Sequence, residues 1–162
     1  MDREGQPTQA GTAHLARRPG EILPCQASRH GPRPLRYPVQ KFQSDAERKL
    51  SVILERESSK WFKPAKGQFQ LYYKSGADHL EYQPDFVAET DSKIYMLEPK
   101  AKNEMTAAEV VAKKDVAVKW CKQASDHAKT YKGKPWKYLL IPHDAIAENI
   151  TLEWLAAQFG VS

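Results

Sequence analysis

The sequence predicts an α/β domain in which helices flank a mixed β-sheet. Three stretches place apolar residues at helical spacing, and four short runs are rich in β-branched and aromatic residues. The first three runs follow one another with only short turns between them, which favours an antiparallel meander. A long helix separates the third run from the fourth, so the fourth strand can pair in parallel with its neighbour.

The first helix is predicted within residues 42–57. Ser44 is a favourable N-cap residue, and Glu47 lies three positions later, which is a capping-box arrangement. The apolar stripe at helical spacing consists of Leu50, Ile53 and Leu54. Pro64 disfavours a continuation of the helix beyond it, because proline restricts the residue that precedes it.

The meander is predicted from three runs, residues 68–74, 80–90 and 92–100. Residues 75–79 have the composition of a turn, and Asp91 with Ser92 forms a tight turn between the second and third strands.

The second half of the chain is predicted to begin with a helix from Thr106 to about Lys129, which has a broad apolar face. Residues 136–142 follow as a buried strand. Residues 150–159 form a closing amphipathic helix, for which Gly160 is the expected C-terminal cap.

The composition is that of one ordinary globular domain, with 162 residues of which 41% are hydrophobic and 28% charged. No apolar run reaches the roughly 18 residues needed to cross a bilayer, and no secretory signal is evident. Cys25 and Cys121 match no disulfide or zinc spacing, so a cytoplasmic location is expected. Walker, GxGxxG, CxxC and HExxH motifs do not occur in the sequence.

Residues 1–41 are predicted to form a disordered basic arm that precedes a single domain over residues 42–162. The arm holds six of the 11 prolines and four of the 8 glycines, with few apolar residues to bury. It also carries most of the net charge of +5, because it has seven basic and three acidic residues. The rest of the chain is therefore close to neutral, and any DNA-binding argument must rest on a local patch.

Charged residues interrupt two apolar strands at Asp85, Glu98 and Lys100. With a turn between Asp91 and Ser92, Asp85 lies directly opposite Glu98, with their Cβ atoms about 4.5–5.5 Å apart. Lys100 is two residues beyond Glu98 and points to the same face. Two opposed carboxylates are destabilising unless a cation offsets their charge.

Two interpretations of these three residues follow. Two carboxylates, a backbone carbonyl and waters suit Mg²⁺, and the lysine would then lie beside a water or a phosphate. The alternative is a surface hairpin with ordinary charges at its strand ends, because a P-D followed by E-x-K is a weak pattern on its own.

Pro84-Asp85 and Glu98-Pro99-Lys100 resemble the motifs of the PD-(D/E)xK phosphodiesterase superfamily. The chain is most similar to the C-terminal nuclease domain of type III restriction endonuclease Res subunits, over roughly residues 41–162. The most specific stretch is residues 119–146, and residues 42–55, 61–73, 82–87 and 95–101 also carry the resemblance.

This resemblance implies a restriction-endonuclease-like fold and Mg²⁺-dependent hydrolysis of DNA that leaves a 5′-phosphate and a 3′-hydroxyl. Asp85 and Glu98, with the carbonyl of Pro99, would be metal ligands, and Lys100 would be the catalytic lysine. Glu47 matches the acidic residue of the first helix, which often reaches the metal through water; its competing role is the helix cap. The implied partners are double-stranded DNA, a helicase half and a DNA methyltransferase subunit.

The chain departs from the family pattern in two respects, and these motivate alternatives to the nuclease hypothesis. Pro99 has no N–H and is expected at a sheet edge or a bulge, although its carbonyl remains available as a ligand. The ATPase motifs of a Res subunit are missing from this chain, which would suit a truncated gene, a split gene or a stand-alone relative. A non-catalytic DNA-binding or assembly module, or an inactive structural remnant, is the rival hypothesis.

Overall fold

The computed structural model describes residues 41–161 and has an α/β architecture with a mixed sheet, as predicted. The helices are α1 (Asp45–Glu57), α2 (Ala108–Lys129) and α3 (Leu152–Phe159), with single 3₁₀ turns η1 (Lys102–Glu104) and η2 (His143–Ala145). The strands are β1 (Lys60–Phe62), β2 (Leu71–Ser75), β3 (Asp78–Tyr82), β4 (Phe86–Glu89), β5 (Ile94–Lys100), β6 (Trp136–Pro142) and β7 (Gly160–Val161). The predicted arm of residues 1–41 lies outside the described residues, apart from Lys41.

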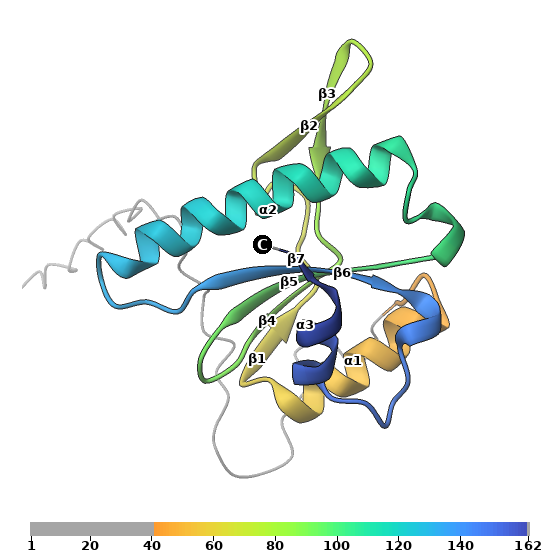
Figure 1. The fold of residues 1–162 in the computed structure, drawn as a ribbon, viewed down its shortest axis with the longest axis vertical. Coiled ribbons are helices and arrows are strands. Elements are labelled where there is room, and N and C mark those ends of the chain that lie inside the picture. Colours follow the sequence, from red (N-terminus) through yellow and green to blue (C-terminus); the bar gives the residue numbers. More distant parts are fainter. Residues whose placement is uncertain (1–40, 162) are drawn as a thin grey trace, which may run out of the picture.

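The main sheet has five strands in the order β1-β4-β5-β6-β7 (Figure 1). The β5–β6 pair is parallel and the other three pairs are antiparallel. The predicted register across the β4–β5 turn is confirmed, since Phe86 pairs with Leu97 and Val87 with Met96. The same alignment, continued by one residue, puts Asp85 opposite Glu98.

Helices cover both faces of this sheet (Figure 1). On one face α1 and α3 pack against alternate strand residues that include Phe86, Leu97 and Leu139. On the other face α2 and the β2–β3 hairpin pack against the intervening residues, among them Met96 and Tyr138. Each central strand is therefore apolar on both sides, which explains why β4, β5 and β6 are continuous hydrophobic runs.

The predicted three-strand meander is wrong in one respect: β2 and β3 form a separate two-stranded hairpin. The predicted strand over residues 80–90 is broken at Gln83 and Pro84, between β3 and β4. Proline cannot donate to a strand ladder, so pairing ends there and the hairpin projects past α2 (Figure 1). The place beside β4 is taken by β1, in which Phe62 pairs with Val87.

The predicted caps of the first and last helices are confirmed in position. The Ser44 hydroxyl accepts a hydrogen bond from the Glu47 N–H, so Ser44 is the N-cap of α1. Gly160 is the C-cap residue of α3, and its φ of −70° is extended and not left-handed. It opens β7 and pairs with Leu139, because the chain turns directly from α3 to the edge of the sheet.

Among the helices of the described residues, none has the length and apolar character needed to span a bilayer.

Candidate active site at the ends of β4 and β5

The sequence-predicted residues Asp85, Glu98 and Lys100 meet where β4 begins and β5 ends. Asp85 immediately precedes β4, and Glu98 and Lys100 lie in the last three residues of β5. Strand alternation puts Glu98 and Lys100 on the same face as Met96, which is the face covered by α2. Glu47 of α1 also lies within electrostatic range of Asp85.

Glu98 is a buried carboxylate with a defined partner for each oxygen. Only 4% of the residue is exposed. The Tyr82 hydroxyl donates to Oε2 at 2.8 Å, and the Lys100 ammonium lies 3.2 Å from Oε1. Contacts of this kind, from a hydroxyl and an ammonium to a carboxylate, are the stronger hydrogen bonds, so together they fix the orientation of Glu98.

Asp85 differs from Glu98 because it has no hydrogen bond or ion pair with any other described residue. Burial is the main cause that raises the pKa of Asp85, to about 7, and the negative charge of Glu98 adds to it. The ammonium of Lys100 opposes this rise without cancelling it. The charged form of Asp85 is therefore unfavourable in this environment, and a nearby cation would offset that cost.

Lys100 remains a cation in this environment. Burial favours the neutral amine, but Glu98 and Asp85 outweigh burial and raise the pKa of Lys100 above its ordinary value. Its side chain is 25% exposed, so the ammonium pairs with Glu98 and still reaches solvent.

Glu47 also belongs to this cluster, on the α1 side. It is 5% exposed, and its Oε2 accepts from the Gln43 N–H at 3.2 Å and from the Lys63 ammonium at 2.5 Å. In a capping box the Glu47 side chain would accept a hydrogen bond from the Ser44 N–H. Here it accepts one from the N–H of the preceding residue, Gln43. Glu47 thus lies in the first turn of α1, and its charge adds to the causes that raise the pKa of Asp85.

Lys63 is the residue of this cluster that the sequence patterns did not single out. It follows β1 directly and contacts Glu47, which is 16 residues earlier in the chain. No local spacing predicts that contact, because it depends on how α1 packs beside β1. The sequence contains only a weak indication of a role for Lys63, which is its position between the apolar residues of β1 and Pro64.

A pair of buried tyrosines lies behind Glu98. The pKa of Tyr82 is raised well above its ordinary value by burial and by the charge of Glu98. Tyr138 of β6 is 1% exposed, and its hydroxyl has no hydrogen-bond partner among the described residues. Its pKa is likewise raised, by burial first and by Glu98 second, so this hydroxyl lies near the carboxylates.

Pro99 was expected at an edge or a bulge, but β5 is an interior strand of the sheet. The pairing of β4 with β5 ends at Phe86 and Leu97, and Pro99 pairs with Ile141 of β6. A strand interior accepts proline here because the neighbouring β4 ladder has already ended.

The donor set fits one Mg²⁺ ion with few protein ligands. Asp85 has an unpaired carboxylate and Glu98 keeps lone pairs beyond its two contacts, while water and phosphate can complete the shell. No group of three or more His, Cys, Asp or Glu side chains within residues 41–161 is arranged to hold a metal ion.

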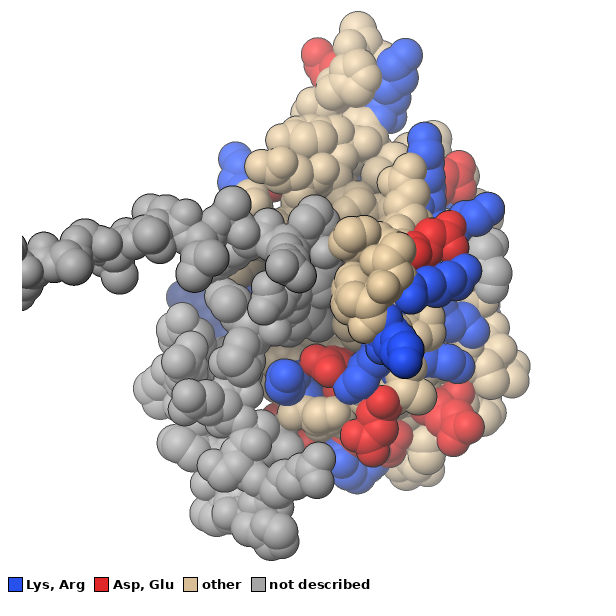
Figure 2. All heavy atoms as spheres, turned by 90° about the vertical axis from the view of Figure 1, so that its left-hand side faces the viewer, with Lys and Arg blue, Asp and Glu red and all other residues tan. Residues whose placement is uncertain are grey.

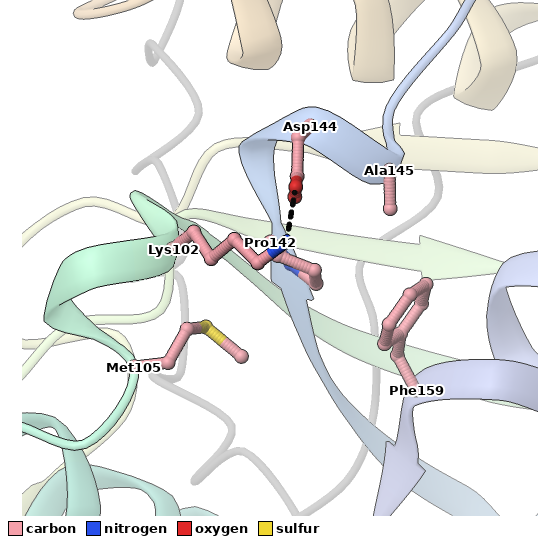
Figure 3. Close-up of a pocket in the computed structure, with 6 residues that line it drawn as sticks. All are labelled: Lys102, Met105, Pro142, Asp144, Ala145 and Phe159. Atoms are coloured by element: carbon pink, nitrogen blue, oxygen red, sulfur yellow. Dashed lines mark hydrogen bonds and ion pairs between the residues drawn. The ribbon is translucent and has the colours of Figure 1, made fainter.

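A shallow hollow adjoins this end of the sheet (Figure 3). Its lining comes from the segments after β5 and β6 and from the end of α3, and consists of Lys102, Met105, Pro142, Asp144, Ala145 and Phe159. Lys102 and Asp144 form an ion pair across it at 3.0 Å. The cationic side chains near the proposed site are therefore partly neutralised by neighbouring acids, and Lys113 is also paired, with Glu109.

The opposite end of the molecule, where α2 ends and β6 begins, mixes charges of both signs (Figure 2). Ion pairs there join Lys129 to Asp126 and Lys134 to Glu89. No sign of charge dominates that end, which contrasts with a basic DNA-binding face.

Comparison of the chain with family models, with curated proteins and with solved structures gave no match.

Proposed function

We propose that residues 42–162 form a Mg²⁺-dependent endodeoxyribonuclease domain of the PD-(D/E)xK superfamily, similar to the nuclease domain of type III restriction Res subunits. The observation that carries the proposal is the alignment of Asp85 with Glu98, with Lys100 paired to Glu98 at 3.2 Å. An unpaired acid, a fixed acid and a lysine at one strand end are groups that can hold a divalent cation and stabilise charge on a phosphodiester.

The arrangement of elements supports a restriction-endonuclease-like fold. An antiparallel unit β1-β4-β5 is extended by the parallel strand β6, and α1 brings Glu47 to the end of β4. Asp85 interacts electrostatically with each of the other three residues assigned from the resemblance, which are Glu47, Glu98 and Lys100.

Asp85, Glu98 and the carbonyl oxygen of Pro99 would hold Mg²⁺. When bound, the ion supplies positive charge to the phosphodiester and makes a water molecule a better nucleophile. The raised pKa of Asp85, caused by burial first and by the charge of Glu98 second, supports this role, because a bound cation would offset the cost of a buried carboxylate.

The chain's own residues would prepare the site for substrate. Tyr82 keeps Glu98 in one orientation through its hydroxyl. Lys100 holds its protons on Nζ and can donate one to a phosphate oxygen or to water while Glu98 accepts another. Phe86 and Val87, the two residues after Asp85, are fully buried in the cores on the two faces of the sheet.

The proposed substrate is double-stranded DNA. A helicase half and a methyltransferase subunit are the partners that the resemblance implies, within a type III restriction system in the cytoplasm. The near-neutral domain and the paired lysines beside the site favour a DNA contact that is completed by such partners.

A non-catalytic DNA-binding or assembly module is the second candidate function. It is favoured by the contacts of Glu98, whose two oxygens are already engaged by Tyr82 and Lys100. This candidate predicts DNA or partner binding that does not depend on metal.

The nuclease proposal is tested by conversion of supercoiled plasmid to nicked and linear forms by the full chain in Mg²⁺. Wild type should cleave, whereas Asp85→Ala and Lys100→Ala should lose at least about 100-fold in rate, the range typical of removing one catalytic group. Lys93→Ala is a matched control, because Lys93 is exposed in the β4–β5 turn. Equal rates in all four proteins would contradict the proposal.

A further inference from the structure

We infer that Lys63 is a second substrate-binding lysine, whose ammonium contacts a DNA backbone phosphate on the α1 side of Asp85 while Lys100 serves the α2 side. This inference rests on the proposed nuclease function and deepens it. Lys63 lies outside both the P-D and the E-x-K motifs, and only the fold brings it close to Glu47 and Phe86.

The register of β1 places Lys63 beside the start of β4. Phe62 pairs with Val87, and one step further Lys63 lies next to Phe86, the residue after Asp85. The Lys63 ammonium lies 5.0 Å from the centre of the Phe86 ring. Phe86 belongs to the core cluster under α1, so Lys63 and Lys100 approach the end of the sheet from opposite faces.

The Lys63 ammonium is held in place and keeps donors free. Its bond to Glu47 uses one of three N–H donors, and the ring of Phe42 lies 5.6 Å away on another side. The Lys63 side chain is 24% exposed, compared with 6% for its partner Glu47. The ammonium therefore has a fixed position, reduced hydration and an open side, which together favour binding of an anion.

The charges of the cluster indicate which anion. Glu47, Asp85 and Glu98 carry three negative charges, and Lys63 and Lys100 carry two positive ones, so the cluster has a net charge of −1 when all five are ionised. A bound divalent cation reverses this to +1, and a backbone phosphate would then meet two ammonium groups. Lys63 is needed for this reversal, because it cancels the charge that Glu47 adds to the site.

The competing explanation is that Lys63 only neutralises the buried Glu47 carboxylate. Lys63→Met alone does not separate the two, since it leaves Glu47 without its partner and destabilises the fold. The comparison is therefore made between Glu47→Gln and the double variant Glu47→Gln/Lys63→Met, in which the glutamine needs no cationic partner. Lys60→Met is the matched control, because Lys60 also pairs with an acid, Glu89 at 3.6 Å, but lies at the start of β1, whereas Lys63 directly follows its end.

The measurement is the affinity of the full-length variants for a fluorescent DNA duplex over a series of NaCl concentrations in the presence of Ca²⁺, because the charge of the cluster favours a phosphate only when a divalent cation is bound. Loss of one phosphate contact should lower the slope of log affinity against log salt by about 0.9 and weaken binding by roughly tenfold at low salt. We expect this change between Glu47→Gln and the double variant, and no change of slope for Lys60→Met.

An unchanged slope on loss of Lys63 would overturn the inference. If wild type cleaves plasmid in Mg²⁺ while the slope is unchanged, the nuclease proposal stands and only the role of Lys63 fails. If the slope falls but wild type does not cleave, the phosphate contact stands and the nuclease proposal fails. No DNA binding by wild type would overturn both.

Discussion

Replacement of Asp85 by asparagine should stabilise the metal-free protein at pH 8. Asp85 is buried beside Glu98 without a partner, and its pKa is raised to about 7. Above that pH the folded protein carries an unfavourable carboxylate, which the amide of asparagine replaces at nearly the same size. A residue that lowers stability in the absence of a ligand is typical of a binding site.

The size of the effect follows from the pKa shift. Below an ordinary carboxyl pKa of 3.8 the folded and unfolded states both hold the proton, so Asp85 has no effect on stability. Between 3.8 and about 7 only the unfolded state releases it, so the free energy of unfolding falls as the pH rises. The full loss, present above pH 7, is at most about 4 kcal/mol at 1.36 kcal/mol per pKa unit.

The assay is thermal unfolding of wild type and Asp85→Asn in EDTA from pH 4 to pH 8. At pH 8 the variant should melt higher, by up to roughly 10 °C, and the difference should vanish toward pH 4. Mg²⁺ should raise the Tm of wild type more than that of the variant. Asp91→Asn, an exposed residue of the β4–β5 turn, is the control. A variant that is less stable than wild type at pH 8, or a difference independent of pH, would refute this reasoning.

Three further predictions concern groups around and behind the site. Tyr82→Phe removes the hydroxyl that donates to the buried glutamate and should lower the free energy of unfolding by about 2 kcal/mol in urea titrations, whereas the exposed Tyr72→Phe should not. Ser44→Ala removes the N-cap of α1 and should lower the free energy of unfolding by about 1 kcal/mol. An unchanged free energy of unfolding would contradict the role of Ser44 as a cap. Burial raises the pKa of Cys121 to about 12, so in a Cys25→Ser chain the folded protein should resist thiol reagents at pH 8 and react only when unfolded. Rapid labelling of the folded protein would contradict this.

The β4–β5 register was predictable because two strong local signals agree. The turn at Asp91-Ser92 fixes the centre of the hairpin, and any shift by one residue would expose its buried residues. The observed pairs, from Phe86 with Leu97 to Glu89 with Ile94, have the predicted alignment. The placement of Asp85 opposite Glu98 needed no further information.

The partners of β4 were not predictable in the same way. Residues 80–90 have strand composition throughout, but Pro84 ends the ladder, and β3 pairs only with β2. The true neighbour of β4 on that side is β1, which has three residues and no periodic pattern of its own. Tertiary packing of Trp61 and Phe62 against the two cores makes it a strand.

The same limit applies to the candidate site. Its acidic residues and Lys100 lie in recognisable motifs, whereas the contacts of Lys63, Tyr82 and Tyr138 arise only after α1, the hairpin and β6 pack together. Gly160 was predictable as the C-cap of α3, but its extended backbone and its pairing with Leu139 at the edge of the sheet were not.

The central claim is that Asp85 and Glu98 are opposed in order to bind one divalent cation. Isothermal titration of the full chain with Mg²⁺ at pH 8 tests it most directly. Wild type should give a saturable heat signal with one ion per chain. Glu98→Gln should abolish the signal, and Glu55→Gln, which alters an exposed acid of α1, should preserve it. A wild type without saturable heat, or an unchanged signal in Glu98→Gln, would contradict the claim.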